Sequence, residues 1–123
     1  MTQINRLTAA TAPEKPIQQE PELVGQVLAY IAAHYQEKLT LQQLADRFYV
    51  SKYHLSHTFS SQVGTSIYRY ILLKRLLAAR AMIQRGEPAG AACIACGFAD
   101  YSSFFRAYRR QFGHGPKEDS GKT

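Results

Sequence analysis

The sequence of 123 residues lacks a long apolar run. No stretch of about 18 uncharged apolar residues, the length that crosses a bilayer as a helix, is present. The start, MTQINRLTAATAPEKP, also lacks the apolar segment of a secretion signal. We therefore expect no membrane association and a cytoplasmic location. With 46% apolar and 20% charged residues, the composition is that of a folded protein. The chain is long enough for one domain, or for two very small ones that share a core.

Cysteine is scarce, with only Cys93 and Cys96 in an isolated C-x-x-C spacing. A redox motif needs a strand and a helix N-terminus around it, and a structural zinc site needs two more ligands. The sequence offers neither, and His54 and His57 lack a third ligand. We expect buried thiols on a short helix, with no metal and no cofactor. No nucleophile–base pair or phosphate-binding loop is visible, so an enzyme is the least expected function.

Acidic residues are rare between Lys52 and Arg110. Between Lys52 and Arg110 there are nine basic residues against two acids, a balance of +7, whereas the whole chain carries +6 and the remainder therefore −1. A basic surface exposed to solvent explains this charge, but a nucleic-acid partner is the more favoured reading.

Apolar spacing and capping residues predict an all-α chain. One helix begins at Glu22, a short helix follows the Thr40–Gln43 capping box, and a second short helix begins after Ser51. A long helix starts near Ser66 and stops at Gly86, and its apolar residues lie on two sides, so it must pack against two partners. A short helix over 89–96 and a helix capped by Asp100 complete the chain.

These helices predict five segments. They are a flexible arm or linker over 1–21, a first helix-turn-helix subdomain over 22–65, a central linker helix over 66–86, a second subdomain over 87–116 and a disordered tail over 117–123.

Two segments, 44–64 and 92–113, resemble each other. Ala45 and Cys93 are 48 positions apart, and Leu55 and Phe104 are 49 apart, so one inserted residue after the turn aligns the copies. Each copy reads as helix, tight turn, helix. Gly97 suits a turn position that needs positive φ, whereas Tyr49 is strained there unless its turn differs. The predicted core residues are Leu44, Ala45, Leu55, Phe59, Leu76, Cys93, Phe98, Phe104 and Tyr108.

The stretches LTLQQLADRF, VSKYHLSHTFSSQVGTSIYRYILLKRLLAARAMI and GFADYSSFFRAYRRQFGHGP resemble the two helix-turn-helix signatures of the AraC/XylS family of bacterial transcription regulators. The resemblance covers roughly residues 23–116. It implies homeodomain-like three-helix units whose second helices enter successive major-groove segments of double-stranded DNA, separated by the central helix. The expected partner is duplex DNA, with RNA polymerase as a further candidate. The expected state is a monomer or the reading half of a larger regulator.

Carrying the family roles onto matching positions gives base-contact candidates on both second helices: Tyr53, Ser56, His57, Tyr101, Ser102, Phe105 and Arg106. Arg106 is the strongest, because its planar fork can bond guanine O6 and N7 together. His57 stands where many family members carry Arg. Candidates for phosphate contacts, which position a protein without reading sequence, are Lys52, Arg69, Lys74, Arg80, Arg109 and Arg110. Arg75 matches an arginine common in the family's central helix and is a candidate for a structural role.

The sequence departs from the family in two places. Ala89 and Ala92 stand where the family usually has bulky apolar residues, and Gly90 lies in the same short helix, so the second unit should be the less stable half. The tail KEDSGKT lacks the aromatic and Arg that commonly close the domain. The alternative function is a helical protein-interaction module, with polymerase or a regulator as partner, that has lost strong DNA binding.

Overall fold

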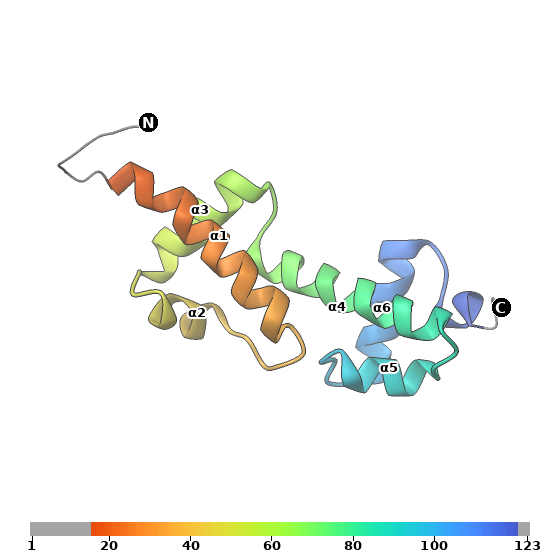
Figure 1. Ribbon diagram of the computed structural model, residues 1–123. Helices are drawn as coiled ribbons and strands as arrows, with labels where there is room; N and C mark the ends of the chain where they lie inside the picture. Colours follow the sequence, from red (N-terminus) through yellow and green to blue (C-terminus); the bar gives the residue numbers. More distant parts are fainter. Residues whose placement is uncertain (1–15, 121–123) are drawn as a thin grey trace.

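The computed structural model describes residues 16–120, in which a long helix joins two groups of shorter elements (Figure 1). The first group holds α1 (Pro16–His34), α2 (Leu41–Arg47) and α3 (Lys52–Val63). The helix α4 (Ile67–Gln84) leads from it to α5 (Ala89–Ala95), α6 (Tyr101–Phe112) and the short 3₁₀ helix η1 (Pro116–Asp119). The described residues contain no strand, and the all-α prediction is confirmed. None of the helices described is long and apolar enough to cross a membrane.

Local capping signals set the helix boundaries. Thr40 and Gln43 form the predicted reciprocal capping box at the start of α2. The side chains of Ser51, Ser66 and Asp100 each accept a hydrogen bond from the backbone N–H three residues later, which places the starts of α3, α4 and α6. The caps at Ser51 and Asp100 and the helix start near Ser66 were predicted from sequence, and they are confirmed.

The internal repeat is visible in the helix boundaries. Helix α5 repeats α2 at a distance of 48 residues, since 41–47 becomes 89–95, and α6 repeats α3 at 49, since 52–63 becomes 101–112. The turn between the helices uses positive φ in both copies, at Tyr49 (φ 59°) and Gly97 (φ 95°). The strain expected at Tyr49 is therefore present, and the residue is 93% exposed.

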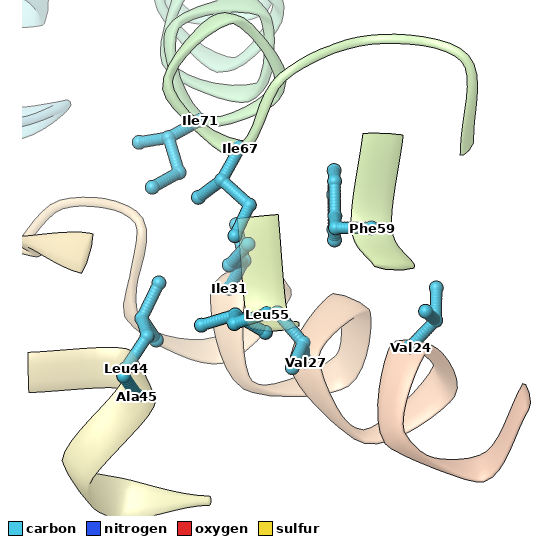
Figure 2. Packing of buried hydrophobic residues seen from close by; sticks show 9 residues of the cluster. All are labelled: Val24, Val27, Ile31, Leu44, Ala45, Leu55, Phe59, Ile67 and Ile71. Carbon is cyan, nitrogen blue, oxygen red and sulfur yellow. The ribbon is translucent and has the colours of Figure 1, made fainter. Parts of the chain in front are cut away.

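Two buried clusters form the core, and α4 contributes to both. The first cluster joins α1, α2 and α3 to the start of α4, where Ile67 and Ile71 point toward Leu44, Leu55 and neighbouring side chains (Figure 2). The second joins the rest of α4 to α5 and α6, and its members are Leu76, Ala79, Ile83, Ala92, Cys93, Cys96, Phe104 and Tyr108. Of the predicted core residues, Phe98 is half-buried at the edge of the second cluster, and the other eight are buried.

The structure corrects the predicted chain ends. Helix α1 begins at Pro16, not at Glu22. Proline is tolerated in the first turn of a helix, where its missing N–H has no intrahelical partner, so Pro16 can open the helix. Residues 1–15 of the predicted arm lie outside the described residues.

The prediction of a disordered tail over 117–123 is wrong for residues 117–120. Helix η1 forms there, Pro116 is fully buried and Asp119 is only 6% exposed. Asp119 Oδ2 accepts hydrogen bonds from Tyr108 Oη at 2.5 Å and from His114 Nε2 at 2.9 Å. The anchors of this segment are polar, and a search for apolar anchors misses them. Residues 121–123 lie outside the described part.

Candidate nucleic-acid interface

Helix α3 presents a polar and aromatic face to solvent because its other face is buried through Leu55, Thr58 and Phe59. Tyr53 is 78% exposed, and its ring stacks on that of His57, with centroids 5.7 Å apart and planes 10° apart. Ser56 is half-buried. Tyr53 and His57 lie one helical turn apart, so they form a single stacked surface.

Helix α6 buries Phe104 and Tyr108 and leaves the predicted reading positions accessible. Tyr101, Ser102 and Arg106 are exposed. Phe105 is partly used inside the molecule, because a Cβ at Gly115 would lie 2.9 Å from Phe105 Cε1. The exposed edge of that ring is what remains available to a thymine methyl group.

Asp100 supplies negative charge at the start of α6. The backbone N–H and the hydroxyl of Ser103 both donate to its carboxylate, and together with the charge of Arg106 these hydrogen bonds lower the pKa of Asp100. The carboxylate therefore stays ionised and caps the helix that carries Arg106.

A cleft of about 970 Å³ separates the two units. Its lining includes Ile67, Ile71 and Arg75 of α4, together with Ser56 of α3 and Arg106 of α6. The cleft thus brings together one predicted reading residue from each unit. The other base-contact candidates lie outside its lining.

The basic candidates fall into two kinds. Lys52, Arg69, Arg109 and Arg110 are exposed, whereas Lys74 and Arg80 are half-buried and lie over aromatic rings. Lys74 Nζ is 5.7 Å from the centroid of Tyr70, and Arg80 Cζ is 4.1 Å from that of Phe112. The charged groups of Lys74 and Arg80 therefore already make cation–π contacts within the protein.

The sequence did not predict the partners of Arg75. Its Nε donates to the carbonyl of Tyr35 at 2.6 Å, and its Nη2 donates to the carbonyl of Glu37 at 2.8 Å. Burial lowers the pKa of Arg75 from its ordinary value, and Tyr68 opposes this effect. The only signal in the sequence was the match of Arg75 to the family's central helix.

The two cysteines are buried and free. Burial raises the pKa of both thiols, and Cys96 Sγ lies 3.7 Å from Met82 Sδ. No cluster of three metal-ligating side chains occurs among residues 16–120. Both thiols are therefore core side chains in the described structure.

Two helix-turn-helix units that share one long helix and repeat each other in helix boundaries define a double helix-turn-helix domain. Residues 44–120 match the family described as "Helix-turn-helix domain". The chain belongs to this family, in its AraC/XylS type.

Known proteins agree with this assignment. The chain is 34% identical over 88 residues to the probable transcriptional regulator LumQ of Photobacterium leiognathi, a match that covers 71% of this chain and 36% of that protein. A probable AraC family transcriptional regulator from Rhodopseudomonas palustris has a similar structure, with a TM-score of 0.72 and 29% identity over 80% of this chain and 94% of that one.

A second similar structure is the DNA-binding domain of AdpA, a global transcriptional factor, solved with a target DNA. Its TM-score is 0.73 at 24% identity, covering 77% of this chain and 86% of that one, which shows the shared fold. The chain spans between a third and a half of the length of the curated relatives it matches, at 36%, 34% and 46% for the first three.

Proposed function

We propose that this chain binds double-stranded DNA in a sequence-specific manner as the reading part of a bacterial transcription regulator. Helices α3 and α6 enter two successive major-groove segments on one face of the duplex. The observation that carries the proposal is that one cleft is lined both by Ser56 of α3 and by Arg106 of α6.

The dimensions of the shared helix support this arrangement. With 18 residues, α4 is about 27 Å long at 1.5 Å per residue. Major-groove segments on one face of B-DNA recur about every 34 Å. A helix of this length, with one reading helix packed near each end, matches the groove repeat in scale. The excess of basic residues between Lys52 and Arg110 supplies the attraction to phosphates.

Within the site, we assign Arg106 to a guanine and the exposed cations Lys52, Arg69, Arg109 and Arg110 to phosphates. The bidentate fork of arginine matches guanine O6 and N7. A stacked pair such as Tyr53 and His57 offers a flat surface to bases or sugars. These four phosphate contacts give a slope of about −3.6 for log K against log salt.

The test begins with selection of bound duplexes from a random pool, followed by affinity measurements on the selected sequence. Arg106→Ala should weaken binding by about 1–3 kcal/mol and relax base preference at one position. Arg85→Ala is the matched control, because it removes an equal charge from an exposed residue that follows α4 and has no assigned contact.

Equal losses for the two variants would show that Arg106 contributes only charge. A salt slope shallower than about −2, together with no selected sequence, would contradict DNA reading. That result would favour the alternative, a helical protein-interaction module.

A further inference from the structure

The segment between α1 and α2 lies where the two units meet. Tyr35 packs against both buried clusters, and among the described residues no other side chain is shared between their two sets of partly buried hydrophobic neighbours. Residues 35–37 lie within the first unit in the sequence, and through Tyr35 they contact both units.

Arg75 fixes this segment to the shared helix. Its two hydrogen bonds reach the carbonyls of Tyr35 and Glu37, on either side of Gln36. Because the guanidinium is planar and its N–H groups point in fixed directions, two simultaneous bonds set both the position and the orientation of the loop relative to α4. Lysine carries the same charge but lacks this fork.

The turn of the second unit lies directly on the same segment. A Cβ at Gly97 would be 2.8 Å from the carbonyl oxygen of Gln36 and 3.0 Å from its Cα. Both are backbone atoms, which cannot rotate away as the end of a side chain can. Gly64 has nearly the same φ, 91° against 95°. Apart from its neighbours in the chain, however, no atom of the described residues lies within 4 Å of a Cβ placed there. Close packing between the units therefore distinguishes Gly97.

We propose that this junction, residues 35–37 held by Arg75 and covered by Gly97, fixes the separation and relative rotation of α3 and α6. Arg75 and Gly97 are thus positioning residues. The effect of this positioning on DNA binding rests on the proposed function. One base pair more or less between half-sites rotates the second by about 35° around the duplex, since a turn holds 10–10.5 base pairs. A fixed junction makes the protein selective for one spacing.

A distance measurement without DNA tests the junction itself. Spin labels are attached at Gln62→Cys on α3 and Gln111→Cys on α6, both exposed positions, and pulsed electron resonance gives the distance distribution between them. Cys93 and Cys96 are buried, and a sample without introduced cysteines measures their background labelling. We expect one narrow distribution in the parent chain, and a broader or shifted one after Arg75→Lys or Gly97→Ala.

Gly64→Ala is the matched control, because it introduces the same left-handed strain without the collision and should leave the distribution narrow. Thermal melting of the two alanine variants shows whether their stabilities match. Distributions as narrow in Arg75→Lys and Gly97→Ala as in the parent chain would overturn the junction.

A spacing series then tests its consequence for DNA. The duplexes carry the two half-sites selected by the parent chain, at the selected spacing and with one base pair added or removed, beside a duplex with one half-site. Losing fixed geometry lowers the effective concentration of the second reader, so both junction variants should bind the selected spacing at least about tenfold more weakly. Their dependence on spacing should flatten, and their affinity for the single half-site should not change.

Two results separate the interpretations. An equal loss on single and paired half-sites, or an unchanged spacing profile, would contradict the positioning role. If the parent chain selects no paired sequence, the proposed function is contradicted. The distances between the spin labels still test whether the junction fixes the arrangement of the two units.

Discussion

Asp119 shows how one polar side chain closes the second unit. It is buried, and it accepts hydrogen bonds from Tyr108 and His114, so residues 114–119 are held against α6. Burial raises the pKa of Asp119, but the hydrogen bonds from Tyr108 and His114 outweigh it and leave the pKa below its ordinary value. Burial and the hydrogen bond to Asp119 raise the pKa of Tyr108.

Replacing Asp119 should therefore cost stability in a pH-dependent manner. A carboxylate whose folded pKa is lowered stabilises the fold above its unfolded pKa, about 3.9, and this stabilisation is lost as pH falls through the folded pKa. The raised pKa of Tyr108 acts oppositely, so its contribution is complete below about pH 10 and declines above it. At pH 7 we expect Asp119→Asn to lower the free energy of unfolding by about 1.5–3 kcal/mol.

Urea denaturation across pH 2–8 measures this effect, with the range chosen to bracket the reference pKa of about 3.9. The exposed neighbour Glu118 provides the control, because Glu118→Gln removes the same charge without breaking a buried bond. The difference between the parent chain and Asp119→Asn should shrink below about pH 4. A difference that stays constant down to pH 2 would contradict the role of the ionised carboxylate.

At the scale of elements, α5 is the weak helix of the fold. Its seven residues, AGAACIA, bury only Ala92 and Cys93. Each large apolar side chain that is missing costs about 1.5–3 kcal/mol of burial. Gly90 lies in this helix without a positive φ, and a methyl group at its Cα would meet open space, so the glycine brings unfavourable helix propensity without a steric reason.

Hydrogen exchange should show this difference between the units. We expect amides of α5 and α6 to exchange faster than those of α2 and α3, because local opening of the second unit costs less free energy. Gly90→Ala should raise the free energy of local opening of α5 and α6 by about 0.5–1 kcal/mol, so that their amides exchange more slowly. Equal protection of the two units in the parent chain would contradict this ranking. Gly64→Ala adds strain to the first unit, so the amides of α2 and α3 should exchange faster in that variant.

The same elements show what the sequence could predict. The helix starts at Thr40, Ser51, Ser66 and Asp100 depend on residues only three positions apart, so local sequence patterns predicted them. The hydrogen bonds of Arg75 reach 40 and 38 residues along the chain, and no spacing rule carries such information. The anchor at Asp119 was missed because a polar residue becomes an anchor only once its partners surround it. The faces of α3 and α6 follow from helical periodicity, but the cleft between them required the whole fold.

At the scale of the molecule, α4 contributes to both buried clusters and lies between α3 and α6 in the chain. Ile67 and Ile71 belong to one cluster, and Leu76, Ala79 and Ile83 to the other. Leu77 lies next to Leu76 on the helix but is 42% exposed, so it can be changed with little loss of packing.

Breaking α4 at this position should uncouple the units. Leu77→Pro removes a helical hydrogen bond and introduces a clash, at a cost of about 3 kcal/mol or more. We expect binding of a duplex with paired half-sites to fall to that of one half-site, as measured by fluorescence anisotropy. Leu77→Ala is the control and should bind like the parent chain. Full paired-site affinity in Leu77→Pro would show that α4 does not set the separation.

The internal repeat has a consequence for how the chain lies along a duplex. The two reading helices differ in sequence, KYHLSHTFSSQV in α3 and YSSFFRAYRRQF in α6, and they follow each other in a single chain. The pair therefore has no two-fold symmetry, and on the proposed function its target is not a palindrome. Reversing such a target would exchange the grooves offered to α3 and α6, so the bound protein has a direction. Any neighbour on the DNA would meet the α3 end or the α6 end, depending on the strand that carries the target.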